Sequence, residues 1–202
     1  MSHPLRRILY VPGIRAKPSP DLHHQVLLDC VLEGVRRADP LTAEALSATP
    51  DCLRLVPWGH LFYPEYRDLG LDAAGIDGLM ADPLPNRAKV TEIFGLKRQL
   101  TSFLHHVGDR MPFLINWLAD ADIRINIRDS MRYFENHDGI AERIRGLLAA
   151  ELQKSWAAGD RVLLMAHSLG SVIAWDTLWS LGDSVQRRDV NAGIDLFLTL
   201  GS

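Results

Sequence analysis

The stretch VLLMAHSLG, from Val162 to Gly170, decides the interpretation of the chain, because a buried strand pattern turns into a helical pattern at one serine. Residues 162–166 are all apolar, which is typical of a strand that is covered on both faces of a parallel sheet. The helical pattern follows without a linker. Strands that alternate with helices in this way predict an α/β fold with a mainly parallel sheet.

The serine lies in the pentapeptide Ala166-His167-Ser168-Leu169-Gly170, which has the spacing of a nucleophile elbow. In an elbow the serine occupies a strained turn, and the residues two before and two after it must be small. Ala166 and Gly170 meet that demand. The turn also directs the amide of Leu169 and the positive end of the next helix at a developing oxyanion. We therefore expect Ser168 to be a nucleophile, with a helix-capping serine as the alternative.

A second strand pattern near the N-terminus supplies the other half of the expected site. The apolar run Ile8–Val11 is closed by Pro12 and Gly13, as at the end of a buried strand. The loop after such a strand provides the second oxyanion donor in this kind of fold. We expect that donor to be the amide of Ile14, with Gly13 allowing a close approach.

The remaining patterns complete a doubly covered sheet. Helices are predicted from Ser19-Pro20 to Asp39-Pro40, over 40–47, over 139–157 and from Ser168 to Leu181, ending at Gly182, and strands are predicted over 52–57 and 194–200. This order predicts a single α/β domain over 1–202 with helices on both faces. Residues 59–137 are less regular, with turn clusters at 70–78 and 82–85 between helical pieces at 90–106 and 112–121. We expect them to form a helical, cap-like insertion.

Composition excludes several classes of protein. The chain has 202 residues and a formal net charge of −3, so no basic surplus favours a nucleic-acid partner. Cys30 and Cys52 have no metal-binding spacing, and we expect them to be buried thiols, with no metal and no cofactor. The apolar stretches are shorter than a signal core or a transmembrane span, so a soluble, cytoplasmic protein is expected. The oligomeric state is left open.

The quoted motifs resemble those of the α/β-hydrolase serine esterases and lipases, including the lipase-like branch related to GPI inositol-deacylases. Residues 8–14, 162–174 and 196–202 carry the resemblance. It implies a serine hydrolase that cleaves a carboxylic ester or a lipid-like acyl substrate, a small molecule, through an acyl-enzyme on Ser168. The first loop departs from the family pattern, because Pro12 stands where a histidine is usual.

The resemblance also implies an acid and a histidine after the serine, in that order. Residues 172–202 contain no histidine. We expect the hydrolase fold to be C-terminally incomplete in this chain, with the triad completed outside these residues. The alternative is a non-catalytic binding or scaffold protein that lacks the base. A nucleotide-binding protein is a weaker third option, because no glycine-rich phosphate loop is present.

Several histidine, aspartate and aromatic residues are further candidates, each with a structural role as the alternative. His60 follows the strand predicted over 52–57 and should share an edge with Ser168, as a substrate contact or surrogate base. His167 points away from its neighbour, which favours packing beside the oxyanion loop. The remaining candidates are expected to be structural or solvated: the pairs His23-His24 and His105-His106, Asp176 and Asp195. The aromatic residues Trp58, Phe62, Tyr63, Phe103, Phe113 and Trp117 either line an acyl pocket or, as we favour, pack a core.

Overall fold

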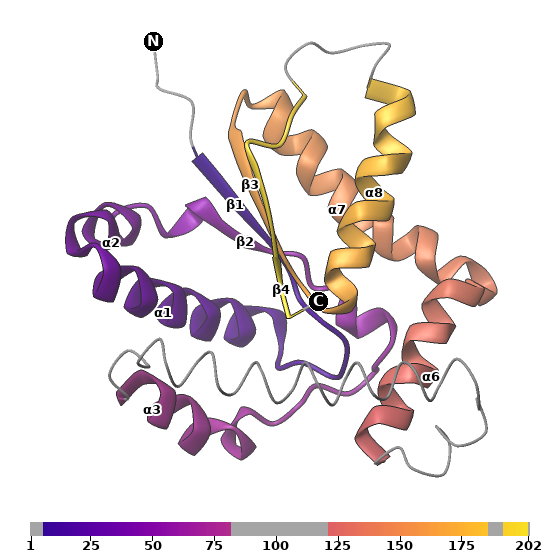
Figure 1. Ribbon diagram of the computed structural model, residues 1–202, viewed down its shortest axis with the longest axis horizontal. Coiled ribbons are helices and arrows are strands. Elements are labelled where there is room, and N and C mark those ends of the chain that lie inside the picture. Colours follow the sequence, from indigo (N-terminus) through magenta and orange to yellow (C-terminus); the bar gives the residue numbers. More distant parts are fainter. Residues whose placement is uncertain (1–5, 82–120, 186–191, 202) are drawn as a thin grey trace, which may run out of the picture. The chain divides into compact units, whose positions relative to one another are not determined.

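The computed structural model describes residues 6–81, 121–185 and 192–201. Its centre is a sheet of four parallel strands in the order β2-β1-β3-β4 (Figure 1). The strands are β1 (Arg6–Val11), β2 (Leu53–Leu55), β3 (Arg161–His167) and β4 (Leu196–Leu200). The prediction of an α/β fold with a parallel sheet is therefore confirmed.

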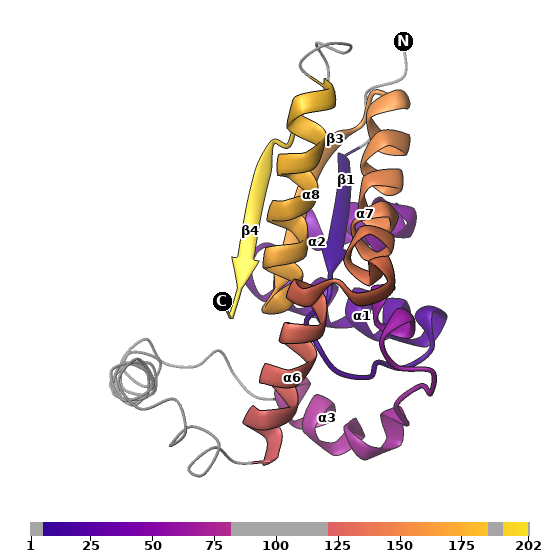
Figure 2. The ribbon, with the colours of Figure 1, turned by 90° about the vertical axis from the view of Figure 1, so that its right-hand side faces the viewer.

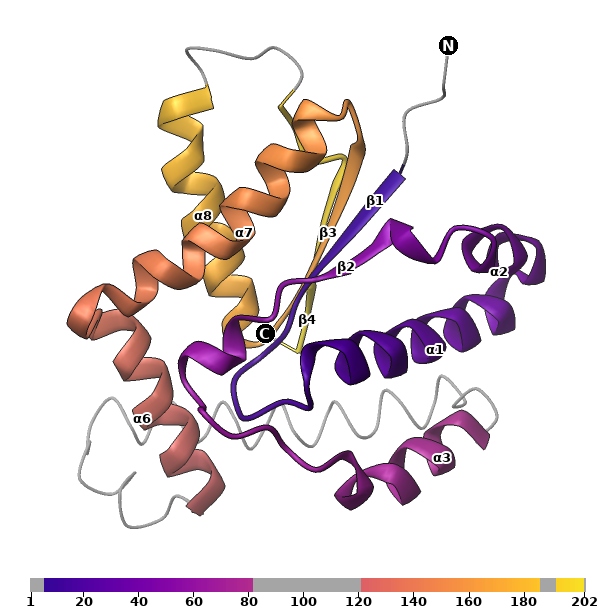
Figure 3. The same cartoon turned by 180° about the vertical axis from the view of Figure 1, so that it is seen from behind.

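The register of the two central strands builds the core. Leu9 of β1 pairs with Leu164 of β3, and Val11 pairs with Ala166, so these side chains share one face of the sheet. All four are fully buried. The helices α7 (Ile140–Ala157) and α8 (Leu169–Val185) pack against these strands, as Figures 2 and 3 show. Each large apolar side chain buried there contributes roughly 1.5–3 kcal/mol.

The other helices come from the first half of the chain and the segment before α7. Helix α1 (Pro20–Ala38) contacts β2 and α2 (Pro40–Ser47). Proline begins both helices, where its missing amide hydrogen has no cost. The further elements are α3 (Ala73–Ala81), α6 (Ala121–Glu135) and the short 3-10 helices η1 (Pro50–Cys52), η2 (Trp58–Leu61), η3 (Leu69–Leu71) and η4 (His137–Gly139).

Several local expectations are wrong. Helix α8 does not end at Gly182 but continues to Val185. The expected turn cluster at 70–78 overlaps α3. Helix α6 lies inside the insertion that was expected to be helical, although no helical piece was placed at its residues beyond 121. Cys30 is exposed, because α1 buries none of its residues fully, and Cys52, in η1, is half-buried. The helical pieces expected at 90–106 and 112–120 lie outside the described residues.

The chain divides into two compact units, one formed by residues 1–71 and 130–202 and the other by Asp72–Asp129. The sheet, α1, α2, α7 and α8 belong to the first unit, and α3 belongs to the second. The cap-like role expected for residues 59–137 stays a prediction. None of the helices within 6–81, 121–185 and 192–201 is long and apolar enough to cross a membrane.

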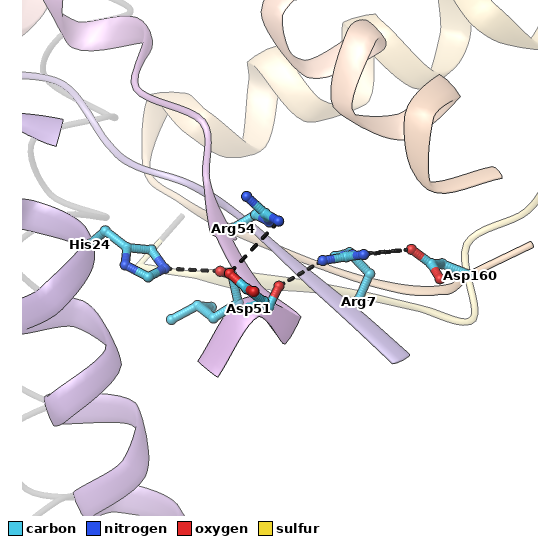
Figure 4. Close-up of polar contacts among 6 residues, drawn as sticks. Arg7, His24, Asp51, Arg54 and Asp160 are labelled. Carbon is cyan, nitrogen blue, oxygen red and sulfur yellow. Dashed lines mark hydrogen bonds and ion pairs between the residues drawn. The ribbon is translucent and has the colours of Figure 1, made fainter. Parts of the chain in front are cut away.

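A buried ion pair joins three strands at the amino edge of the sheet (Figure 4). The Arg7 guanidinium of β1 donates to the Asp160 carboxylate at 2.9 and 3.1 Å and to the Asp51 carbonyl at 2.6 Å. The side chains of Arg7 and Asp160 are 15% and 3% exposed. Nearby, the His24 imidazole donates to the Leu53 carbonyl at 2.9 Å, which ties α1 to β2. The cluster therefore fixes where β1, β2 and β3 begin.

We predict that Asp160→Ala lowers the free energy of unfolding by about 3 kcal/mol, because it leaves the Arg7 guanidinium buried without its anion. The matched control is Asp195→Ala. Asp195 pairs with Arg161 at 2.9 Å, but these side chains are 41% and 56% exposed. We expect the control to lose less than about 1 kcal/mol. Urea denaturation measures both, and equal losses would contradict the role given to the buried pair.

Candidate active site

Ser168 stands between β3 and α8 in a strained backbone conformation. Its φ is +51°, in the left-handed region that residues with a side chain rarely adopt. The Ser168 amide donates to the Leu200 carbonyl at 3.0 Å, and the Ser168 carbonyl accepts from the Ser171 amide at 2.8 Å. The expectation that the serine occupies a strand-to-helix turn outside the ordinary α and β regions is therefore confirmed. Figure 1 shows the end of β4 beside the start of α8, where this turn lies.

The two small residues of the pentapeptide lie where the turn leaves no room. Ala166 is fully buried. A Cβ on Gly170 would lie 2.7 Å from the Pro12 carbonyl oxygen and closer still to that of Val11. Because these neighbours are backbone atoms, they cannot move aside for a side chain. The start of α8 therefore rests directly on the end of β1, which brings the elbow against the loop that begins at Pro12.

His167 lies between the two loops that flank Ser168. One edge of its imidazole is so close to Gly13 that a Cβ there would be 2.5 Å from Nδ1. The other edge faces Gly201, where a Cβ would be 3.2 Å from Nε2. Burial, followed by the charge of Lys17, lowers the pKa of His167 and keeps it neutral at neutral pH. His167 is nevertheless exposed, so these contacts agree with packing at the surface, beside the loop after β1.

The loop after β1 is held by η2. The indole Nε1 of Trp58, which is fully buried, donates to the Pro12 carbonyl at 2.8 Å. Trp58 also packs edge-to-face on Phe62 with a centroid distance of 5.4 Å. Phe62 is 6% exposed and lies 4.7 Å from the Arg132 guanidinium. Trp58 and Phe62 are therefore core residues, in agreement with the packing interpretation, whereas Phe103, Phe113 and Trp117 lie outside the described residues.

The strand order places this pair of loops at a switch point. From β1 the chain goes to β2 on one side, and it later returns to β3 on the other side of β1. Open α/β sheets bind ligands outside the carboxyl ends of the strands at such a reversal. The loop from Pro12 follows β1, and Ser168 follows β3. Ser168 and the amides of Leu169 and Ile14 therefore follow directly after β3 and β1, the two strands that flank the switch point.

The pair His23-His24 was expected to be solvated, but both residues are half-buried. His23 is half-buried, and burial lowers its pKa to about 4, with Lys17 and then His24 adding to the effect. The reason for the correction is that α1 begins directly beside the loop after β1. His60 lies in η2 at the same edge, exposed, and its Nδ1 donates to the Pro57 carbonyl. The pair His105-His106 lies outside the described residues.

No base reaches the serine in the part of the chain that the structure describes. There the Ser168 hydroxyl has no hydrogen-bond partner, so His60 is not placed as a surrogate base. Asp176 accepts a hydrogen bond from the Tyr133 hydroxyl at 2.9 Å, and Asp195 pairs with Arg161 at the amino edge. Both acids thus have structural roles. Among the described residues, no group of three metal-ligating side chains is arranged to hold a metal ion.

Cavities do not yet define a substrate pocket. A cavity of about 20 Å³ lies beside the loop after β1, between Pro12, Lys17, His23 and Tyr63. This is room for a single water molecule. A larger hollow of about 660 Å³ lies at the opposite, amino edge of the strands, beside Arg7 and Leu196. The strained Ser168 lies at the carboxyl edge, away from this hollow.

Comparison with known proteins adds no relative: no family model, curated protein or solved structure matches the chain.

Two residues of this edge, Arg15 and Lys17, were missed by the sequence analysis, and Tyr63 was expected only as a pocket or core aromatic. Arg15 has a φ of +86°, which is strained for a residue with a side chain. Lys17 donates through Nζ to the Ile14 carbonyl at 3.0 Å. The Tyr63 hydroxyl accepts from the Arg15 amide at 3.2 Å. The signal that could have drawn attention to Arg15 and Lys17 is that two cations follow directly after the expected oxyanion loop.

We predict opposite effects for two glycine substitutions in the same helix. Gly170→Ala should lower the free energy of unfolding by about 2 kcal/mol, because its Cβ meets the carbonyl oxygens of β1 and Pro12. Gly182→Ala has no atom within 4 Å of the new Cβ and should gain up to about 1 kcal/mol from helix propensity. Chemical denaturation measures both. A Gly170→Ala variant as stable as the parent would refute the close approach.

We also predict that Lys17→Met raises the pKa of both His23 and His167, because it removes a positive charge that disfavours their protonation. NMR titration of the imidazole resonances measures this. Lys154→Met, at the end of α7, is the control and should leave both values unchanged. If neither histidine responds to Lys17→Met, the placement of the ammonium group is wrong.

The lowered pKa of His23 makes the stability of the folded chain depend on pH. Between the unfolded pKa of 6.5 and the folded value of about 4, the unfolded chain binds a proton at His23 that the folded chain does not. His23 therefore lowers stability progressively as the pH falls through this window. Lys17→Met should make that loss smaller.

Proposed function

We propose that this chain carries the nucleophile and the oxyanion donors of a serine hydrolase of the α/β-hydrolase type. Its substrate would be a carboxylic ester or a lipid-like acyl compound, cleaved through an acyl-enzyme on Ser168. The observation that carries the proposal is the positive φ of Ser168 at the junction of β3 and α8. A positive φ costs free energy for a residue with a side chain, and residues held in such conformations cluster at functional sites.

The chemistry follows from what the turn presents. The Ser168 hydroxyl would attack the carbonyl carbon, and the negative charge would develop on the carbonyl oxygen. The amide of Leu169 opens α8, where the helix dipole favours an anion. The amide of Ile14, from the loop packed against the elbow, would be the second donor. Gly13, Ala166, His167 and Gly170 would hold these groups together without taking part in the chemistry.

The proposed hydrolase fold has two further features. We propose that helices cover both faces of the sheet and that residues 59–137 act as a cap over the site. A general base and its acid would be supplied by residues other than those brought to Ser168 here. A serine at its free pKa is a weak nucleophile without such a base.

The second candidate is a non-catalytic binding or scaffold protein with a hydrolase-like sheet. The observation that favours it is the Ser168 hydroxyl, which has no hydrogen-bond partner among residues 6–81, 121–185 and 192–201. Both candidates use the same edge of the sheet, and only the reactivity of Ser168 separates them.

We predict that a fluorophosphonate probe labels Ser168 slowly and that added imidazole accelerates the labelling at least about tenfold, by acting as the missing general base. In this step Oγ bonds to phosphorus, the P–F bond breaks, and imidazole takes the hydroxyl proton. Mass spectrometry of the intact and digested chain locates and times the adduct. Ser168→Ala should abolish it.

Ser47→Ala is the control, because Ser47 lies in α2 and should not affect the rate. A folded chain that gives no Ser168 adduct even with imidazole would favour the binding-protein alternative. Fast labelling without imidazole would instead indicate a base within the chain, and His60→Ala would then be the deciding variant.

A further inference from the structure

The peptide group between Ile14 and Arg15 is hydrogen-bonded at both of its ends. Its carbonyl oxygen accepts from Lys17 Nζ at 3.0 Å, and its amide donates to the Tyr63 hydroxyl at 3.2 Å. The two partners come from different parts of the chain, since Tyr63 lies 48 residues after Arg15. Because a peptide group is planar, two bonds at opposite ends fix the orientation of the whole plane.

The backbone next to this peptide needs such support. Arg15 has a φ of +86°, a conformation that is unfavourable for any residue with a Cβ. Strain of this kind persists only when the surrounding structure over-determines it. Without the two bonds we expect the loop to relax toward an ordinary φ. That relaxation would rotate the adjoining peptide groups, including the amide of Ile14.

Both partners are themselves held in place. The stem of Lys17 lies against Gly59, where a Cβ would be 3.6 Å from Cγ. The Tyr63 amide donates to the Gly59 carbonyl at 2.9 Å, and its ring meets Phe62 edge-to-face with a centroid distance of 6.1 Å. The donor and the acceptor are thus both anchored on η2, the same segment whose Trp58 holds the Pro12 carbonyl.

We propose that Lys17 and Tyr63 are positioning residues that clamp the Ile14–Arg15 peptide and thereby aim the Ile14 amide at the oxyanion formed on Ser168. This inference rests on the proposed hydrolase function and adds two residues to its machinery. Neither residue takes part in the reaction. Their effect is exerted through the backbone of the loop, because only the φ and ψ bonds of Ile14 separate its amide from the clamped plane.

The first experiment tests the clamp without any reaction. In Tyr63→Phe, which removes only the hydroxyl, amide hydrogen exchange at Arg15 measured by NMR should accelerate about fivefold or more. Tyr66→Phe is the matched control, since Tyr66 is an exposed tyrosine of the next segment, and Arg15 exchange should not change. Unaltered exchange in Tyr63→Phe would overturn the proposal directly.

The second experiment tests the consequence for Ser168. With imidazole present, Tyr63→Phe and Lys17→Met should each slow the maximal fluorophosphonate labelling rate about tenfold or more, because a misdirected oxyanion donor fails in the transition state. The probe concentration at half-maximal rate should stay unchanged. Lys17→Arg keeps a charged donor and should restore most of the rate, whereas Lys154→Met should match the parent.

The outcomes separate this inference from the function on which it rests. If the parent chain gives no adduct, the hydrolase proposal fails, and the exchange data still decide whether the clamp exists. If the parent chain labels and exchange accelerates but the maximal rates are unchanged, the clamp is structural only and the positioning role is wrong. The double variant, Tyr63→Phe with Lys17→Met, should label no more slowly than the slower of the two single variants, because both hydrogen bonds hold one peptide plane.

Discussion

The contact between Gly170 and the carbonyl oxygens at the end of β1 is the constraint on which the site depends. It allows α8 to start within van der Waals distance of the backbone of a neighbouring strand. With α8 so placed, the chain leaving β3 has to turn sharply, and Ser168 takes a φ of +51°. The same contact sets the loop after β1 beside the turn at Ser168.

The sheet explains why backbone strain is tolerated at the carboxyl edge of the strands. Parallel strands end together, and the amino edge opposite is fixed by the buried pair of Arg7 and Asp160, while the fully buried side chains of β1 and β3 fill the core between the two edges. Stability comes mainly from these layers, whereas the carboxyl edge holds both Ser168 and Arg15 with positive φ. Strained residues persist where rigid surroundings over-determine them. The neutral histidines at this edge fit the same environment, because Lys17 and burial both disfavour their protonation.

Local sequence signals were enough to predict the helices and strands that are marked by apolar periodicity and by proline or small residues at their ends. Proline after aspartate located α2 at 40–47, and the small residues around Ser168 located the elbow. Helix α6 falls within the insertion that was expected to be helical, but its bounds were not predicted, and Ile123, Ile125 and Ile127 recur at every second residue rather than at helical spacing. Gly182 was misread as a stop, but a glycine in a helix costs only about 1 kcal/mol and does not end it.

The clamp on the oxyanion loop belongs to the class of features that no local pattern can predict. It joins Arg15 to Tyr63 across 48 residues, and it exists only because η2 folds back beneath the end of β1. The sequence could suggest that the Ile14 amide faces the serine, since that follows from a strand, a glycine and a helix in order. It could not suggest the two hydrogen bonds that hold the Ile14–Arg15 peptide. A backbone donor has no side chain to direct it, so its aim has to be set by neighbours on the same peptide chain, and in this protein those neighbours are the ammonium of Lys17 and the hydroxyl of Tyr63.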